Sequence, residues 1–206
     1  MSFSDHTCST GNEAVDAGTG CMKGKRRTRQ AKIRLLEGEK VRLRPVEIDD
    51  IPKLLEWDSD PEITRWAGKK FETKDDALNW HLRTSLQHRT YAIELFDGRL
   101  IGEIEIVDVS WRVKSGEVRV FIGDKHLWDR GLGEDAVRTL ADALFNFTSM
   151  RELFLRVDQE NVRALRCYQK VGFRAEARLK HEREDGSPRT LLLMKLGRPA
   201  EECAGA

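Results

Sequence analysis

The chain has 206 residues, of which 39% are hydrophobic, and 36 Lys and Arg against 35 Asp and Glu give a formal net charge of +1. This composition suits one domain with an appended tail, and the balanced charge excludes a global field that would recruit nucleic acid or an anionic membrane. Cys8, Cys21, Cys167 and Cys203 show no metal-binding spacing, and no apolar run reaches the roughly 18 residues of a membrane span. We therefore expect a reduced, cytoplasmic protein without a metal site.

The first 36 residues are predicted to be a flexible basic tail. Residues 1–20 are small and polar without the apolar centre of a signal peptide, and "KGKRRTRQAK" at residues 23–32 is a basic run. Such a segment buries too little apolar area to order itself. A solvated extension is the favoured interpretation, and contact with nucleic acid, the ribosome or an acidic surface is the alternative. The expected organisation is a tail at 1–36, a domain at 37–198 and a C-terminal tail at 199–206.

The first half of the domain alternates strand and helix signals. "KVRLRPV" alternates as a half-buried strand does and ends at Pro45, and a short helix, "IPKLLEW", follows Asp50. Thr73 is the predicted N-cap of a second helix. The dipeptide Asp97-Gly98 joins "YAIELF" and "LIGEIEIVDV" in a β-hairpin, and "GEVRVFIG" is the next strand.

The second half begins with a long helix. Apolar residues recur at helical spacing after Gly133, and the strand "ELFLRV" follows. A helix from residue 162 to about 170 is stopped by Gly172. Two strands around Asp185-Gly186, "FRAEARLKHE" and "RTLLLMKL", complete the chain. Strand-rich runs with isolated helices predict an α+β fold.

Two glycines stand at the start of the long helix. Gly131 and Gly133 remove side chains from a helix terminus whose first amides have no helical partners and carry the positive end of the dipole. Bare amides of this kind bind phosphate. A turn without a ligand is the alternative, because a lone G-x-G is a weak signal.

A dinucleotide-binding fingerprint is the nearest competing interpretation. Gly131, Gly133 and Ala136 satisfy G-x-G-x-x-A, and Asp158 ends the next strand. In that fold the first strand runs almost directly into the first glycine, whereas residues 123–130 intervene here. Too little chain follows for the second half of such a fold, so a nicotinamide cofactor is only a minor alternative.

A second motif is "DQENVRALRCYQKVGF". Asn161 stands at a helix start and Tyr168 follows seven residues later, nearly two full turns, so both face one side of the helix. Separately, an N-cap and a half-buried aromatic explain them. Their position one strand after the glycines favours a shared site.

With these motifs the chain resembles the GCN5-related N-acetyltransferase family. The resemblance covers residues 37–196 and rests on "LLEGEKVRLRPVEIDD", "EVRVFIGD", "WDRGLGEDA" and "NVRALRCYQKVGF" in this order. Ribosomal-protein N-terminal acetyltransferases and spermidine N-acetyltransferases look most similar. The last two motifs also look like those of aminoglycoside 6′-N-acetyltransferases.

The resemblance implies a mixed, mostly antiparallel sheet that splays between "EVRVFIG" and "ELFLRV", with acetyl-CoA as cosubstrate in the opening. Its pantetheine would pair with the backbone at Phe121 and Ile122 and bond Asn161, and Tyr168 would stand beside the thioester sulfur. Its pyrophosphate would sit on the amides of Arg130, Gly131, Leu132, Gly133 and Glu134, and Trp128, at the first position of the motif, is a further implied cofactor-binding residue. One departure from the family pattern is Trp128 in place of Gln or Arg, followed by the carboxylate of Asp129, for which Lys125 and Arg130 would compensate.

The chemistry requires a proton acceptor, because an alkyl amine with a pKa near ~10 is neutral in only about one molecule per thousand at pH 7. Glu117 is the predicted base, directly or through water, with Glu103 and Glu105 as further candidates and exposed strand carboxylates as the alternative. Tyr168 is the predicted donor to the departing thiolate. Cys167 points about 100° away on the helix, which disfavours a covalent acetyl-enzyme.

The sequence therefore predicts an N-acetyltransferase that moves the acetyl group of acetyl-CoA directly to a primary amine in a ternary complex. A protein N-terminus, a polyamine and an aminoglycoside remain open as acceptors, and a noncatalytic acyl-CoA-binding regulatory module is the alternative function. Acceptor choice is expected in the two early helices, the loop "SDPEITRWAGKKF" and the hairpin "DVSWRVKSG". No membrane or nucleic-acid partner is expected, and a homodimer is compatible with this prediction.

Overall fold

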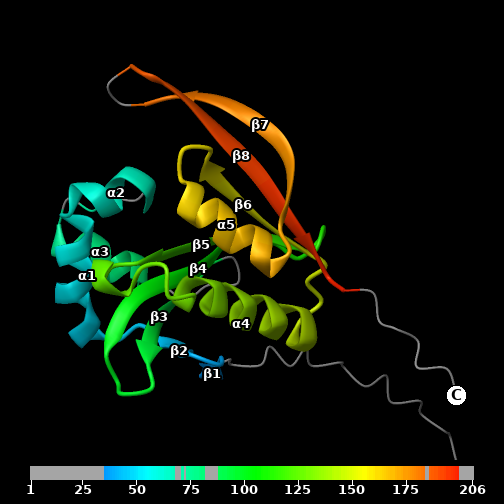
Figure 1. Ribbon diagram of the computed structural model, residues 1–206. Helices are drawn as coiled ribbons and strands as arrows, with labels where there is room; N and C mark the ends of the chain where they lie inside the picture. The colour runs from blue at the N-terminus through cyan, green and yellow to red at the C-terminus, as the bar shows by residue number, and fades with distance from the viewer. Residues whose placement is uncertain (1–34, 68–70, 72, 82–87, 184–185, 200–206) are drawn as a thin grey trace, which may run out of the picture. The chain divides into compact units, whose positions relative to one another are not determined.

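The structure is a computed structural model that describes residues 35–67, 71, 73–81, 88–183 and 186–199. One eight-stranded sheet has the strand order β1-β2-β3-β4-β5-β6-β8-β7 (Figure 1). Its strands are β1 Leu36–Glu37, β2 Val41–Pro45, β3 Arg89–Leu95, β4 Leu100–Ser110, β5 Ser115–Ile122, β6 Glu152–Asp158, β7 Arg174–Glu182 and β8 Pro188–Gly197. Neighbours are antiparallel except for the parallel pair β5 and β6. The predicted α+β class with a mostly antiparallel sheet is confirmed.

Helices cover both faces of this sheet (Figure 1). They are α1 Ile51–Asp58, α2 Pro61–Ala67, α3 Lys74–His81, α4 Leu132–Phe147 and α5 Val162–Val171, with 3-10 turns η1 at Ile48–Asp50 and η2 at Lys125–Leu127. The alternation of side chains along β5 explains the two layers. Val118 belongs to the core cluster that includes α4, whereas Phe121 packs against the cluster that includes α1.

Several local predictions are confirmed. Val41 and Leu43 on β2 are fully buried, as the strand alternation requires. Thr73 caps α3, since its Oγ1 accepts the amide N–H of Asp76 at 3.1 Å. Gly98 in the β3–β4 turn and Gly172 after α5 have φ values of 89° and 112°, in the left-handed region that glycine adopts without strain.

Three element boundaries differ from the prediction. The predicted loop at residues 59–71 contains α2, whose start Asp60 marks by accepting the amide of Glu62 at 2.9 Å. Helix α4 begins at Leu132, before Gly133. Strand β1 begins at Leu36, which pairs with Leu43, one residue inside the predicted tail. Residues 1–34 and 200–206, with Cys8, Cys21 and Cys203, lie outside the described residues, so the tail assignments stay predictions.

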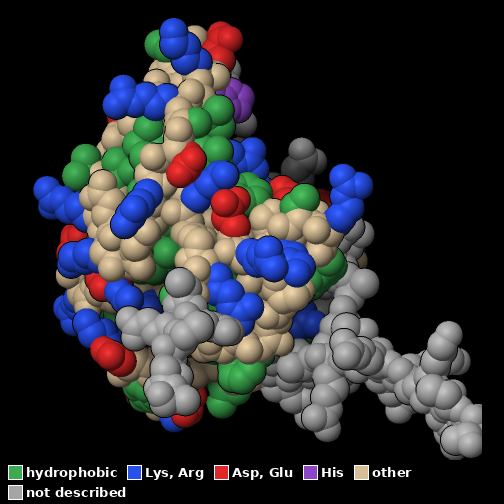
Figure 2. Space-filling view, turned by 90° about the vertical axis from the view of Figure 1, so that its right-hand side faces the viewer, with side chains coloured by type: hydrophobic (Ala, Val, Ile, Leu, Met, Phe, Trp, Pro, Cys, Tyr) green, Lys and Arg blue, Asp and Glu red, His purple; other side chains and the backbone are tan. Residues whose placement is uncertain are grey.

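Strand β7 forms one edge of the sheet and, within the described ranges, pairs with β8 alone. All nine of its residues are exposed, and its register with β8 shifts between Ala175 and Ala177. Figure 2 shows charged side chains at the upper end of the molecule, where Figure 1 places the free end of the β7–β8 ribbon. Charges and bulges on an edge strand oppose edge-to-edge association. The homodimer therefore stays a prediction without support from this edge.

Candidate active site

The sheet opens between β5 and β6. Three residue pairs join these strands, and the last of them is Glu117 with Phe154. From Val118 to Ile122, β5 continues beside β4, and no strand of the described part of the chain pairs with its other side. Unpaired backbone groups at a strand edge are available to a ligand that binds as an added strand. The splay expected between "EVRVFIG" and "ELFLRV" is therefore present.

A cavity of about 640 Å³ lies at this opening. A volume of this size suits a cofactor-sized ligand. Its wall includes most of the residues predicted to form the site: Phe121, Ile122, Trp128, Gly131, Leu132, Gly133, Glu134, Asn161 and Tyr168. Arg130 and Glu117, both within the described part of the chain, are not on this wall. The fold thus brings together segments from β5, α4 and α5 that are up to 47 residues apart.

The N-terminus of α4 faces the cavity without a side-chain cap. Gly131 precedes the helix with φ 75° and ψ 11°, and no side chain bonds the first amides. A Cβ on Gly133 would lie 3.8 Å from Ile122 Cγ1 and 3.9 Å from Cys167 Sγ, which is ordinary contact distance. The amides of this turn are therefore open to an anionic ligand, as the two glycines predict.

The first turn of α4 also holds the N-terminal hairpin. Asp135 accepts the backbone N–H groups of Glu39, Lys40 and Val41 at 3.1, 2.8 and 3.0 Å. The ammonium of Lys40 lies 3.0 Å from the position that a Cβ on Gly131 would take. The Asp135 carboxylate is thus hydrogen-bonded to the hairpin backbone, and the Lys40 ammonium, which also donates to the carbonyl of Arg130 at 3.3 Å, stands beside the glycine turn.

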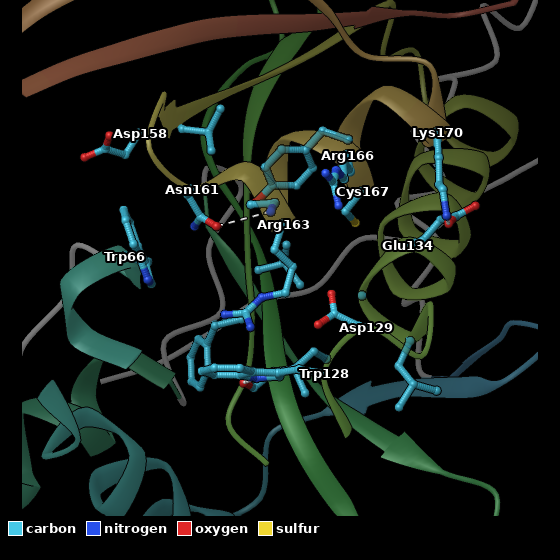
Figure 3. Close-up of a pocket in the computed structure, with 18 of the residues that line it drawn as sticks. Trp66, Trp128, Asp129, Glu134, Asp158, Asn161, Arg163, Arg166, Cys167 and Lys170 are labelled. Atoms are coloured by element: carbon cyan, nitrogen blue, oxygen red, sulfur yellow. Dashed lines mark hydrogen bonds and ion pairs between the residues drawn. The ribbon is translucent and has the colours of Figure 1, made fainter. Parts of the chain in front are cut away.

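Asn161 and Tyr168 lie on α5 as their spacing predicts. Asn161 is the N-cap, and its Oδ1 accepts the amide of Ala164 at 3.2 Å (dashed in Figure 3). Tyr168 is buried, with 8% of its surface exposed, and its ring centroid is 6.0 Å from that of Phe173. Burial raises the pKa of the Tyr168 phenol above its ordinary value near 10.0. At neutral pH the hydroxyl therefore keeps its proton and can act as a donor.

Cys167 also lines the cavity and is a free thiol. Burial, followed by the nearby charge of Glu134, raises its pKa to about 12. The thiolate is the nucleophilic form of cysteine, so this residue is unreactive near neutral pH. The absence of a covalent acetyl-enzyme stays a prediction.

Trp128 and Arg163 form a contact that the sequence did not reveal. The guanidinium carbon of Arg163 lies 3.5 Å from the centre of a Trp128 ring, and Trp128 Nε1 donates to the carbonyl of Ile122 at 2.7 Å. Figure 3 shows Arg163 reaching from α5 to the indole. Arginine stacks on aromatic faces without losing its charge. The Trp128 indole thus contacts the backbone of Ile122, one of the two residues expected to pair with pantetheine. It also holds the Arg163 guanidinium at the cavity.

The Glu117 carboxylate is occupied by two guanidinium groups. Arg156 donates through Nε to Oε1 at 3.0 Å and through Nη2 to Oε2 at 2.6 Å, and Arg119 donates to Oε2 at 3.0 Å. Burial alone would raise the pKa of Glu117, but the hydrogen bonds from Arg156 and Arg119 outweigh it, and the pKa lies below its ordinary value. A lowered pKa weakens the carboxylate as a proton acceptor.

The two other candidate bases are buried as well. Glu103 and Glu105 on β4 have 1% and 4% of their surfaces exposed, and Glu117 has 3%, so the alternative of exposed strand carboxylates is wrong. Glu103 Oε2 lies 2.6 Å from His81 Nδ1. Glu105 accepts from Trp80 Nε1 at 3.1 Å and lies 3.2 Å from His88 Nε2. Local strand periodicity does not reveal such partners, since they come from α3 and from His88, the residue before β3.

The charges around Asp129 are arranged differently from the prediction. Asp129 is exposed and adopts φ 60°. The ammonium of Lys125 contacts Asp60 at 2.7 Å and Glu62 at 2.8 Å, so it is directed to α2 and not to the glycine turn. Arg130 is exposed and is not on the cavity wall. Lys40 is the cation that the structure brings to the glycine turn.

The chain matches the family model described as an acetyltransferase (GNAT) domain over residues 40–174. The chain belongs to the GNAT acetyltransferase family. It is an acetyl-CoA-dependent N-acetyltransferase. The open junction, the uncapped helix terminus and the buried tyrosine are thus features of a GNAT acetyltransferase.

Known relatives agree with this membership. The chain is 28% identical over 146 residues to the spermidine N(1)-acetyltransferase of Escherichia coli (strain K12), covering 69% of this chain and 77% of that protein. A solved structure of spermidine N-acetyltransferase from Vibrio cholerae, in complex with CoA and spermine, matches with a TM-score of 0.70 and 21% identity, over 77% of this chain and 95% of that one. A GNAT-family acetyltransferase from Bacillus anthracis matches with a TM-score of 0.69 and 16% identity, over 80% and 98%. The two structural likenesses establish the fold.

Two further observations concern the described residues. No helix among them is long and apolar enough to cross a membrane. No group of His, Cys, Asp and Glu side chains in the same residues is arranged to hold a metal ion.

Proposed function

We propose that this GNAT enzyme acetylates a primary amine of a polyamine or a similar small cation by direct transfer in a ternary complex. The observation that carries the proposal is that one cavity, at the β5–β6 opening, has both the uncapped start of α4 and Tyr168 on its wall. The E. coli relative is named a spermidine N(1)-acetyltransferase, which favours a polyamine as the acceptor.

In this proposal the cosubstrate lies along the free stretch of β5. Its pantetheine arm pairs with the backbone of Phe121 and Ile122 and meets the side-chain amide of Asn161. At Ile122 the arm would share or displace the Trp128 indole N–H, which donates to the Ile122 carbonyl at 2.7 Å. Its pyrophosphate meets the amides at the start of α4. The residues present fit this group, because the glycine turn leaves the amides bare and Gly133 has only ordinary contacts around it. Acetyl-CoA supplies an activated thioester to this site.

Tyr168 is proposed as the donor to the departing sulfur. Support comes from its place on the cavity wall, where its phenol is protonated at neutral pH. A neutral phenol stabilises a developing thiolate by hydrogen bonding or by giving up its proton. The role of Glu117 as the base stays a prediction, and the pairing of its carboxylate favours the different role argued below.

Support for a cationic acceptor comes from the cavity wall near α2 and the end of β6. Glu62, Trp66 and Asp158 lie there, and Figure 3 shows Trp66 and Asp158 on one side of the cavity with Glu134 and Lys170 on the other. A carboxylate and an indole face both attract an alkylammonium group. These groups already have cationic partners: Glu62 pairs with Lys125, and Asp158 pairs with Arg183 and Arg189. The guanidinium of Arg65 lies over the Trp66 ring, so an acceptor ammonium would share or displace these contacts.

The decisive experiment measures CoA thiol release with spermidine, spermine, an aminoglycoside and a peptide with a free N-terminus. We expect the polyamines to give the highest kcat/KM, with mass spectrometry showing a single added acetyl group. Preference for the peptide or the aminoglycoside would overturn the acceptor assignment. CoA binding without transfer to any amine would instead indicate a noncatalytic acyl-CoA-binding module.

A further inference from the structure

The parallel junction between β5 and β6 is short. Ser115, Gly116 and Glu117 pair with Glu152, Leu153 and Phe154, and the pairing ends there. The two halves of the sheet diverge beyond this point. The width of the opening is set where the backbone pairing of β5 and β6 ends. A side-chain contact between the two strands just past Phe154 therefore acts at this point.

Glu117 and Arg156 make such a contact. Glu117 belongs to the last residue pair on β5, and Arg156 stands on β6 two residues after Phe154. Their Nε–Oε1 and Nη2–Oε2 distances of 3.0 and 2.6 Å describe a two-bonded fork. A fork fixes both distance and angle between the strands that carry it.

The same carboxylate has a second guanidinium partner that does not cross the gap. Arg119 donates to Glu117 Oε2 at 3.0 Å from the same strand, β5. Both carboxylate oxygens are thus engaged, and Glu117 itself is off the cavity wall while Arg156 is on it. These contacts lower the pKa of Glu117 against the opposing effect of its burial.

We propose that Glu117 and Arg156 form a clamp that sets the opening of the cleft, and that Glu117 is a positioning residue and not the acceptor of the amine's proton. The inference rests on the proposed function, because the cleft is taken to hold acetyl-CoA. Glu117 acts through Arg156, which holds β6 at a fixed spacing from β5 below the cavity. Beyond Phe154, where the backbone pairing of β5 with β6 ends, the side chains of the clamp connect the two strands.

Arg119 provides a matched control for the clamp. Arg156→Gln and Arg119→Gln each remove one guanidinium from the same carboxylate, but only the first cuts the link to β6. We expect Arg156→Gln to weaken CoA binding by at least about tenfold in calorimetry, and Arg119→Gln by less than about threefold. Arg156→Lys keeps the charge without the fork and should behave like Arg156→Gln.

Hydrogen exchange in the cofactor-free variants gives a readout independent of turnover. Arg156→Gln should raise exchange at the amides of β5 and β6 near the junction, and Arg119→Gln should not. Equal effects of the two variants on exchange and on CoA affinity would overturn the clamp. This test keeps its meaning if the wild-type enzyme acetylates none of the amines, an outcome that would refute the proposed function alone.

Glu117→Gln separates the clamp from a role as base. The clamp predicts that Glu117→Gln weakens CoA binding as Arg156→Gln does, that the double variant adds little, and that the acid limb of the kcat profile remains. A base would instead lose kcat and the acid limb with CoA affinity intact. Arg119→Gln and Arg156→Gln would then both move that limb to higher pH, because each removes a group that lowers the pKa of Glu117. That pattern would refute the clamp.

Discussion

Helices α4 and α5 both begin at the wall of one cavity, and their N-termini are built in opposite ways. Asn161 caps α5 through its own side chain, whereas Gly131 precedes α4 in a left-handed conformation with no side-chain cap. A capped terminus satisfies its own amides, and an uncapped one leaves them for a ligand. The start of α4 therefore has amides available to an anion, whereas Asn161 satisfies an amide of its own helix.

The two helices also differ in how they are anchored. Helix α4 has buried residues from Leu132 to Phe145, whereas on α5 the buried residue is Tyr168. At Gly133, where an added Cβ would make only ordinary contacts, a substitution should alter binding more than folding. On α5, a substitution of Tyr168 can affect both the packing of the helix and the proposed donor to the departing sulfur.

The largest expected effect is that of Tyr168→Phe on α5. The ring and its packing remain and the donor is lost, so kcat should fall by roughly 10²- to 10⁴-fold while CoA affinity changes little. Steady-state kinetics with one amine measures both parameters. A fall below about threefold with KM unchanged would assign Tyr168 to packing, and a large rise in KM for acetyl-CoA with kcat intact would make it a binding residue.

On α4, Gly133→Val should weaken CoA binding by at least about tenfold, which is roughly 1.4 kcal/mol. The new side chain stands where phosphate would meet the amides, yet the Cβ has only ordinary contacts, so the melting temperature should change little. Calorimetry and thermal unfolding check the two parts. Gly133→Ala should give a smaller loss, and unchanged affinity in folded Gly133→Val would show that the glycine only turns the chain.

Asn161→Ala tests the cap on α5 and should lower the free energy of unfolding by about 1 kcal/mol, because the Ala164 amide loses its acceptor. Denaturant unfolding measures this loss. Asn161→Ser restores a capping oxygen without the amide group. If Ser restores stability and CoA affinity alike, the Asn161 side chain serves its helix alone and the proposed contact with pantetheine fails.

The smallest effect is expected from deleting residues 1–34. Their sequence lacks a core-forming pattern, so the melting temperature, CoA affinity and acetylation of a small amine should stay nearly unchanged. Thermal unfolding and kinetics on the shortened chain check this. Loss of folding or of CoA binding would place this segment inside the domain.

Local sequence signals predicted much of the fold, because turns and caps are decided by few neighbouring residues. Thr73, Gly98 and Gly172 act as their types require. The helix α2 was missed although Asp60-Pro61 is a helix start, since the segment that follows is short and polar around the buried Ile63. Its existence depends on packing against other elements.

The site was predictable where one segment carries the chemistry and unpredictable where distant segments meet. Gly131 and Tyr168 follow from motif spacing. The stack of Arg163 on Trp128 joins residues 35 positions apart, and the fork of Arg156 on Glu117 joins residues 39 positions apart. Neither pairing has a local pattern, so Glu117 appeared in the sequence as a free strand carboxylate.

The hydrogen bonds between Asp135 and the N-terminal hairpin fix a distant segment of the chain beside the glycine turn. The backbone amides of residues 39–41 donate to the Asp135 carboxylate in the first turn of α4, and the same segment places the Lys40 ammonium beside Gly131. Cutting the chain after Val41 would leave Asp135 without these three donors and take the Lys40 ammonium away from the glycine turn. The β1–β2 hairpin, which lies about 90 residues before the glycine turn in the chain, therefore supports both the conformation and the charge of this turn.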